Sequence, residues 1–227
     1  LRDGPGSSPN GQVTVSNSTF NNIQTYIALS GGSAKNLDAT VGNVFDGVDA
    51  ATATLDQLFD IENHLQHKLD DTSNGLIRVK EGQVFVTAEK GNIQAGVSAA
   101  SVGDTVNVQA GTYNDPRVSI NTAGINLAGQ QGAKIVVPSV TETNAIDVWA
   151  NDVTIQGFEI TGPAANESYL TYAWGGTVTR GIAIHNGVTN FTIKDNYIHG
   201  LRNNILIDGR NTGSVTNNII DNSKSGI

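Results

Sequence analysis

The sequence contains no cysteine and no methionine, and charged residues make up only 15% of its 227 residues. Without cysteine the chain can form neither disulfide bonds nor thiolate-ligated metal sites. No apolar run approaches the roughly 18 residues that a membrane-spanning helix needs, and no signal peptide is visible. We therefore expect no membrane insertion, and we interpret the chain as an exported protein whose leader has been removed.

The few charges are mostly acidic. Thirteen lysines and arginines stand against 21 aspartates and glutamates, so the formal net charge is −8 at pH 7. Proteins bind nucleic acid through a basic surface that displaces counterions from the phosphates, so we expect no nucleic-acid partner. A neutral glycan, an anionic polymer bridged by cations, or another protein stays open as the partner.

An internal repeat is the strongest feature of the sequence. Similar short runs rich in β-branched residues and asparagine occur at residues 13–20, 153–160, 191–198 and 214–220. Matching positions lie 22 residues apart for Ile193 and Val215, and 23 residues apart for Ile184 and Ile207. This period is too short for a strand–helix–strand unit and is typical of one coil of a solenoid. We therefore predict an all-β parallel β-helix solenoid with coils of about 22 residues.

Apolar residues alternate within each predicted strand, as Ile182 and Ile184 illustrate. Alternate side chains of a strand lie on opposite faces, so one set fills the interior of the coil. Asn17, Asn196 and Asn218 lie where the coil must turn. We expect them to form a ladder whose side-chain amides satisfy the backbone groups of the turns.

The segment 91–113 has a different pattern: a short amphipathic helix over 93–100, then Gly103-Asp104, a strand, and Gly111-Thr112-Tyr113. This pattern resembles the opening of pectate-lyase-like and copper-maturation-type right-handed β-helix proteins, and the resemblance covers 91–227 and 1–32. It implies a right-handed coil, a helix that caps the first turn, and a location outside the cell or on its surface. It does not imply an activity, because this fold carries lyases, hydrolases, epimerases and adhesins.

Between the two β-rich parts lies a segment with helical periodicity. Apolar residues at three-to-four spacing predict an amphipathic helix over 48–69, and Asp46, Asp49 or Thr52 could cap it. A strand pair or hairpin is predicted at 76–79 and 84–87. We therefore divide the chain into β-helix coils at 1–32, a linker at 33–90 with the helix and these short strands, and a capped β-helix at 91–227.

The two ends of the chain match each other. Residues 13–29 align without a gap with 191–207, and the final strand is cut at Ile227. We interpret the chain as one period of a longer structural repeat, an extracellular or cell-surface fibre unit that assembles head-to-tail, covalently or between subunits. An arbitrary fragment whose coils merely look alike is the alternative. The predicted assembly interface comprises Val13, Val15, Phe20, Ile27, Leu29, Ile205, Ile207, Ile219 and Ile227.

The sequence elements that mark polysaccharide hydrolases, lyases and epimerases on this fold are absent, so we identify no catalytic residues and lean against an enzyme. The nearest candidate is an outward-facing column of His185 with Trp149, Asp208 and Ser30, in which a His–Asp pair could transfer protons. A polysaccharide-active enzyme with an unrecognised site stays open as an alternative.

Metal and cofactor binding have little support in the sequence. His64 and His67 have helical metal-ligand spacing without completing a metal motif, and we expect them on a solvated helical face. We expect no cofactor. Calcium could bind among the turn aspartates and asparagines, although no dedicated calcium loop is present.

An insertion provides the best binding feature. After Ile160 the next matching strand starts at Ile182, so about 15 extra residues, 162–176, protrude from the coil. Long loops on solenoids often carry function, and exposed aromatic rings stack on sugars or anchor protein contacts. The chain is therefore also a candidate glycan-binding adhesin, or these rings simply pack on a sheet. The predicted carbohydrate- or partner-binding residues are Trp149, Tyr169, Tyr172 and Trp174.

Overall fold

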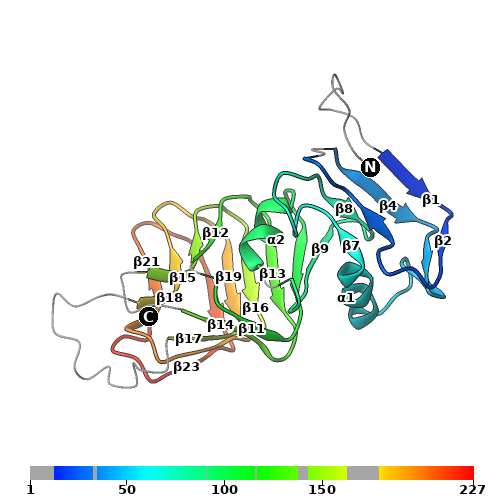
Figure 1. Cartoon of the computed structure of the whole chain (residues 1–227). Helices are drawn as coiled ribbons and strands as arrows, with labels where there is room; N and C mark the ends of the chain where they lie inside the picture. Colours follow the sequence, from blue (N-terminus) through cyan, green and yellow to red (C-terminus); the bar gives the residue numbers. More distant parts are fainter. Residues whose placement is uncertain (1–12, 33–34, 91, 116, 138–142, 163–178) are drawn as a thin grey trace.

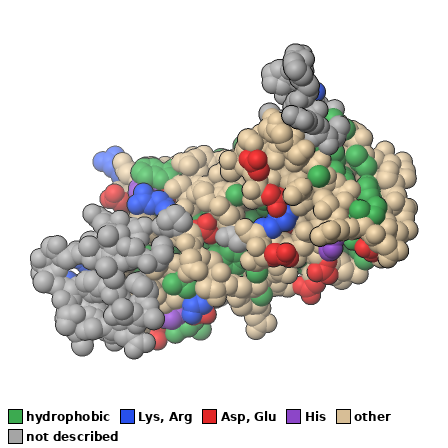
Figure 2. Space-filling view, in the orientation of Figure 1, with side chains coloured by type: hydrophobic (Ala, Val, Ile, Leu, Met, Phe, Trp, Pro, Cys, Tyr) green, Lys and Arg blue, Asp and Glu red, His purple; other side chains and the backbone are tan. Residues whose placement is uncertain are grey.

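The computed structural model describes residues 13–32, 35–90, 92–115, 117–137, 143–162 and 179–227. These residues form a parallel β-solenoid of about seven turns with two short helices (Figure 1). The predicted parallel β-helix is thereby confirmed. Its strands stack along one axis, from the N-terminal turns at one end to the C-terminal turns at the other. On the described part of the face seen in Figure 2, charged side chains are scattered among uncharged polar side chains and backbone.

Three parallel sheets build the main body of the solenoid. The first sheet contains β9 (Gln83–Val86), β10 (Thr105–Val108), β13 (Asn126–Gly129), β16 (Thr154–Gln156), β19 (Phe191–Lys194) and β22 (Gly213–Thr216). The second sheet contains β11 (Gly111–Tyr113), β14 (Ala133–Val136), β17 (Glu159–Thr161), β20 (Tyr197–His199) and β23 (Ile219–Asp221). The third sheet contains β12 (Val118–Ile120), β15 (Thr143–Val148), β18 (Thr179–Ile184) and β21 (Asn203–Ile207).

The strand register confirms the predicted spacing. Ile193 pairs with Val215, and Ile184 pairs with Ile207, as the repeat requires. Inward-facing residues stack from turn to turn, and in the third sheet Ile120, Val148 and Ile184 are each 0% exposed. Because the turns of the main body bury such rows, its core runs continuously along the solenoid axis.

A second set of turns precedes this body. β1 (Val13–Ser16), β4 (Leu37–Val41) and β8 (Ile77–Arg78) form one sheet, and β3 (Ile27–Ala28) pairs in parallel with β7 (Leu65–Gln66). β2 (Thr19–Phe20) pairs in parallel with β5 (Val44–Phe45), which pairs antiparallel with β6 (Val48–Asp49). These turns have their own apolar cluster, which Phe85 of β9 joins from the main body. Much of the segment predicted as a linker therefore forms solenoid strands.

The larger helix is shorter than predicted. α1 spans Leu55–Asn63 instead of 48–69, and Thr54 caps it in a reciprocal box with Gln57. The residues on either side pair as strands β6 and β7. β6 pairs locally with β5, and β7 pairs with β3 of the preceding turn. This strand pairing on both sides of α1 overrides the helical periodicity that the sequence shows there.

The second helix agrees closely with its prediction. α2 spans Ile93–Ala99, with Asn92 as its N-cap, and it packs against β9, β10 and β12. It occupies the first turn of the body, where the third sheet has no strand before β12. The two strands predicted at 76–79 and 84–87 are present as β8 and β9, but they lie in different sheets and do not form a hairpin.

The predicted asparagine ladder is present, but Asn43 belongs to it in the N-terminal turns and Asn17 does not. Asn196 accepts the Phe158 N–H at Oδ1 (3.0 Å) and donates to the Ile155 carbonyl (3.1 Å). Asn218 and Asn43 bond in the same way to the turns that precede them. Asn17 does not occupy this position.

Asn17 instead belongs to a left-handed corner one residue earlier in the turn. Its φ is 51°, and the equivalent Asp195 and Asn217 have φ of 57° and 56°. Glycine holds the same corner at Gly42 and Gly157, with φ of 64° and 80°. Gly, Asn and Asp tolerate this conformation best, so the corner explains why they recur with the coil period.

Candidate functional site

The most elaborate polar cluster in the described residues lies on the outer face of the third sheet. We call it the Asp147 cluster; its members are Arg117, Asn144, Asp147, Trp149, Arg180 and His185. Inward-facing Ile146 and Val148 fill the core, which turns the side chain of Asp147 to the outside. The parallel pairing of β15 with β18 then sets Trp149 beside His185, just beyond the two strand ends.

Asp147 is the centre of the cluster. Asp147 is only 1% exposed, although its side chain lies on the outer face of the sheet. Its Oδ1 atom accepts hydrogen bonds from Asn144 Nδ2 and His185 Nε2, both at 2.6 Å, and Arg117 Nε lies 3.1 Å from Oδ2. A buried carboxylate is costly unless donors surround it, and these three donors meet that need.

The carboxylate also fixes the imidazole. A carboxylate can only accept, so the contact with Asp147 requires a proton on His185 Nε2. The ring of His185 lies parallel to that of Trp149, at 7° and with centroids 3.3 Å apart. Arg180 Nη1 donates to Asn144 Oδ1 at 3.2 Å and thereby orients the amide that contacts Asp147.

The cluster presents an aromatic platform with charged groups at its edge. Trp149 is 56% exposed, and one ring face is covered by His185. The Arg117 side chain is 50% exposed, so part of its guanidinium can reach a ligand. Flat aromatic rings beside hydrogen-bonding groups suit ligands that have both apolar faces and hydroxyl groups.

Part of this site was visible in the sequence. The backbone N–H groups of Trp149, His185 and Asp208 bond to the preceding strand in the same way, which confirms these three as one column. The His–Asp pair is different from the expected one, because His185 bonds to Asp147 rather than Asp208. Ser30 does not belong to the column, because it follows β3, which pairs with β7 in a separate sheet.

The sequence did not reveal Arg117, Asn144, Asp147 or Arg180 as members of this cluster. The alternation around Ile146 and Val148 was the available signal that Asp147 faces outward. Three of the predicted binding residues, Tyr169, Tyr172 and Trp174, lie outside the described residues, so only Trp149 can be placed.

The residues of the predicted assembly interface have unequal environments. Ile205 is 1% exposed and Leu29 is 2% exposed, whereas Ile207 is 37% and Ile227 is 65% exposed. Ile219 pairs with Tyr197 on the outer face of the second sheet, so it does not belong to an interior row. Half-buried members at the other end are Val13, Val15 and Phe20.

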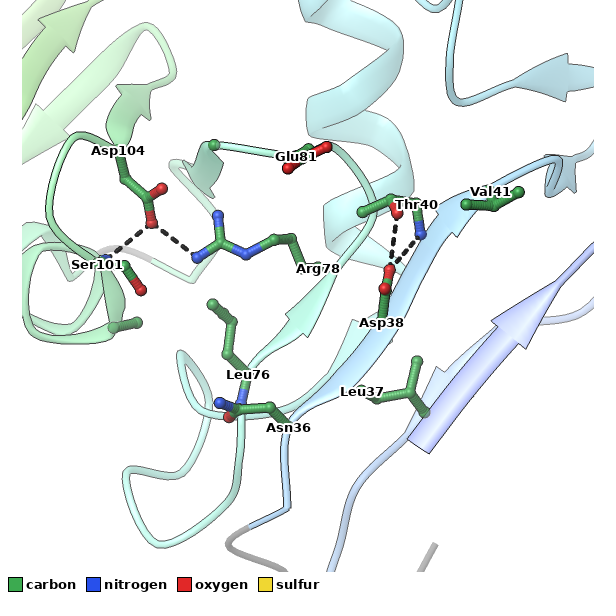
Figure 3. Close-up of a pocket in the computed structure, with 12 residues that line it drawn as sticks. Asn36, Leu37, Asp38, Thr40, Val41, Leu76, Arg78, Glu81, Ser101 and Asp104 are labelled. Atoms are coloured by element: carbon green, nitrogen blue, oxygen red, sulfur yellow. Dashed lines mark hydrogen bonds and ion pairs between the residues drawn. The ribbon is translucent and has the colours of Figure 1, made fainter. Parts of the chain in front are cut away.

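A cavity of about 630 Å³ lies between the N-terminal turns and the body (Figure 3). Arg78 crosses it and contacts Asp104 at 2.7 Å, and its Nη1 donates to the Gln83 carbonyl at 3.1 Å. On the opposite wall, hydrogen bonds from the Thr40 backbone and hydroxyl lower the pKa of Asp38. Arg78 and Asp38 are thus already engaged within the protein, which makes this cavity a weaker candidate than the Asp147 cluster.

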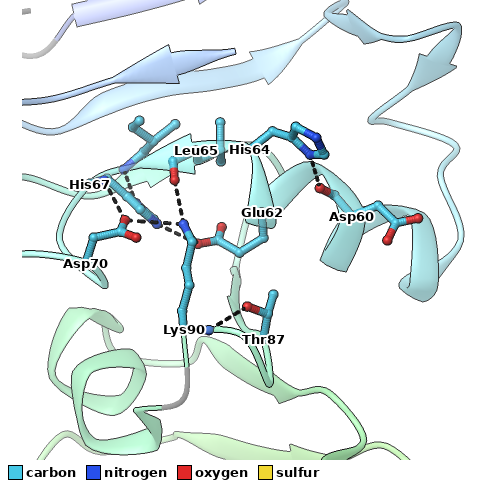
Figure 4. Close-up of polar contacts among 9 residues, drawn as sticks. Asp60, Glu62, His64, Leu65, His67, Asp70, Thr87 and Lys90 are labelled. Carbon is cyan, nitrogen blue, oxygen red and sulfur yellow. Dashed lines mark hydrogen bonds and ion pairs between the residues drawn. The ribbon is translucent and has the colours of Figure 1, made fainter. Parts of the chain in front are cut away.

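A buried ionic network joins α1 to the start of the body (Figure 4). His67 Nε2 lies 2.6 Å from Glu62 Oε1, and Lys90 Nζ bonds to the Leu65 carbonyl and to Asp70. The expected solvated face for the two histidines is wrong for His67, which is 1% exposed and follows β7 rather than lying in the helix. His64 is separate and bonds to the Asp60 carbonyl.

Two other kinds of feature are absent from the described residues. No group of three or more His, Cys, Asp or Glu side chains is arranged to hold a metal ion in this part of the chain. No helix within it has the length and apolar character to cross a membrane.

Comparisons of the chain with protein-family models, with curated proteins and with solved structures found no match.

Proposed function

We propose that this β-solenoid binds polysaccharide on the outer face of its third sheet, with the exposed ring of Trp149 as the platform for a sugar ring. The observation that supports this proposal is the parallel stacking of Trp149 on His185, whose imidazole is held by the buried carboxylate of Asp147. A platform fixed in this way loses little side-chain freedom when a ligand binds, which favours affinity.

Recognition fits this geometry better than cleavage does. Glycoside hydrolysis generally uses two carboxyl groups about 5 to 9.5 Å apart that both reach the substrate. Asp147 is almost fully buried and already accepts three donors, so it holds other side chains in place. In this proposal Trp149 and Arg117 contact the sugar, and His185 supports the indole ring of Trp149. Binding requires no cofactor and no calcium ion.

Fluorescence provides a direct test, because the chain has only two tryptophans. In a Trp174→Phe background, the emission reports Trp149 alone. We expect a saturable change on titration with at least one of four polymers: dextran, a soluble β-glucan, polygalacturonate or alginate. In affinity electrophoresis, Trp149→Ala should weaken binding about tenfold or more, since one stacked ring contributes about 1.4 kcal/mol or more.

The control removes an exposed apolar side chain elsewhere. Val102 is 76% exposed, so Val102→Ala should leave both folding and binding unchanged. If no polymer changes the Trp149 emission, or if Trp149→Ala binds as tightly as the parent, Trp149 is not a sugar platform.

A second candidate function is end-to-end assembly into a fibre. Asn43 bonds to the first described turn through Ser18 and Val15, as Asn218 does to its preceding turn through Asn196 and Ile193. The turns at the two ends therefore share one stacking pattern. A turn of one copy has the backbone geometry to stack on a terminal turn of another, and repeated contacts of this kind generate filaments.

Light scattering and electron microscopy test the assembly. We expect concentration-dependent filaments from the parent protein, and only monomers from an Ile207→Asp, Ile227→Asp double variant. Both residues are exposed, so the folded monomer should tolerate the charges. Parent protein that stays monomeric at all concentrations, or a variant that still forms filaments, would contradict this mode of assembly.

Two further proposals concern origin and location. We propose that the chain is related to the pectate-lyase-like right-handed β-helix proteins and acts outside the cell or on its surface. Support comes from α2 in the first turn of the body and from the Gly111-Thr112-Tyr113 strand that follows. A polysaccharide ligand agrees with that location.

A further inference from the structure

A second aromatic–imidazole pair lies on the outer face of the second sheet. Tyr197 and His199 are alternate residues of β20, so both side chains leave the same face. Their rings are nearly parallel, at 17° with centroids 4.2 Å apart, and Tyr197 is 38% exposed. One face of the tyrosine ring is thus supported, as the Trp149 ring is supported by His185.

Side chains from two earlier turns hold this pair in place. His199 Nε2 lies 3.1 Å from Glu159 Oε1, and Lys134 Nζ lies 2.7 Å from the same oxygen. The register of β14, β17 and β20 aligns Lys134, Glu159 and Tyr197 in one row. We call these four residues the Tyr197 cluster.

The electrostatics of the Tyr197 cluster keep its carboxylate ionised. Burial raises the pKa of Glu159, but hydrogen bonds and charge from Lys134 and His199 outweigh it, so that the pKa stays below its usual value. The Lys134 and Glu159 side chains remain about one-third exposed, at 35% and 33%. The cluster therefore offers a charged donor and a charged acceptor beside an exposed ring.

The two clusters have the same kind of composition and occupy the same part of the solenoid. Each combines an aromatic ring, a stacked imidazole, a carboxylate bonded to that imidazole, and a cation. Glu159 lies on β17 and Arg180 lies on β18, which is the next strand along the chain. The two clusters thus lie on neighbouring sheets and share the turn that contains β14 and β15 and the turn that contains β17 and β18 (Figure 1).

We propose that the Tyr197 cluster is a second sugar-binding subsite, in which a pyranose ring stacks on Tyr197 while Lys134 and Glu159 bond to its hydroxyl groups. This inference rests on the proposed polysaccharide binding at Trp149 and extends it to two platforms. A polymer that engages both platforms gains effective concentration at the second, whereas a short oligosaccharide that occupies one platform does not.

The test compares polymer and oligosaccharide on three variants: Trp149→Ala, Tyr197→Ala, and the double variant. The probes are the four polymers named above and the tetrasaccharide of whichever polymer binds. Tyr197→Ala should weaken polymer binding about tenfold, yet leave the tetrasaccharide titration of Trp149 fluorescence unchanged. Tyr197→Phe should keep polymer binding close to that of the parent, because the ring remains. The double variant should lose polymer binding altogether.

The control and the opposing outcomes separate the two proposals. Ile219 neighbours Tyr197 on the same face and is 64% exposed, so Ile219→Ala should bind as the parent does. Parent-like polymer binding by Tyr197→Ala would overturn the second subsite and leave the Trp149 platform intact. If Tyr197→Ala weakens polymer binding and Trp149→Ala does not, the first platform is overturned and the second is supported. No binding by any parent–polymer pair would overturn both.

Discussion

Replacing Asn196 with alanine should lower the free energy of unfolding by about 3 kcal/mol. Asn196 is 2% exposed, and its amide pairs the Phe158 N–H and the Ile155 carbonyl of the previous turn. Alanine would leave both of these backbone groups without the side-chain partner that crosses the turn. Each buried polar group left unpaired costs about 1–3 kcal/mol, and a small cavity adds to the loss.

Asn218→Ala is the matched control for this experiment. Asn218 makes the same inter-turn bonds, to the Asn196 N–H and the Ile193 carbonyl, but it is only half-buried. Water can replace part of the hydrogen bonding that the substitution removes. We therefore expect at most about half the loss in free energy of unfolding that Asn196→Ala causes. Urea unfolding followed by far-ultraviolet circular dichroism measures both. If the two variants lose the same free energy of unfolding, or lose none, the burial of a ladder asparagine does not set its contribution to stability.

Replacing Glu62 with alanine should destabilise the N-terminal turns by about 3 kcal/mol or more. Glu62 is 2% exposed and His67 is 1% exposed. Glu62 Oε1 lies 2.6 Å from His67 Nε2 and 3.5 Å from Lys90 Nζ. Removing one partner from a buried charged network costs about 3–5 kcal/mol, because the remaining groups stay buried without their counterpart. Hydrogen exchange should rise mainly in residues 13–79, where α1 and its turns lie.

Two variants on the same helix make this experiment specific. Glu62→Gln retains an oxygen that accepts from His67 Nε2 but removes the charge beside Lys90, so its effect should be intermediate. Asp60→Ala changes an exposed side chain and should stay within about 0.5 kcal/mol of the parent. Faster exchange spread evenly over the whole solenoid in Glu62→Ala would contradict a local role for the network.

The ladder and the network differ in how far the sequence predicted them. The position of Asn196 followed from its place near a turn and from Asn218 one coil later. Asn17 was misplaced by one residue, because asparagine is favoured both in the ladder and at the left-handed corner before it. The network was not predicted, because the strand pairing of β7 that ends α1 also buries His67.

The Asp147 cluster and the Tyr197 cluster show the same division. Outward-facing Trp149 and His185 could be placed in one column from alternation together with the alignment of the repeats. Their partner Asp147, and the whole Tyr197 cluster, depend on which residues of different turns become neighbours. The offset between paired residues of the first sheet is 21 for Val106 with Leu127, and the next offsets along that row are 28, 38 and 22.

The sequence by itself determined the solenoid, the inward and outward faces of its strands, the short helix at 93–99 and the corners that need Gly, Asn or Asp. These features depend on local alternation and on backbone conformations that few residue types tolerate. Only the tertiary structure decided the length of α1, the burial of His67 and the partners of Asp147 and Tyr197. Those features depend on contacts between turns, and turns of unequal length bring together residues whose separation follows no fixed period.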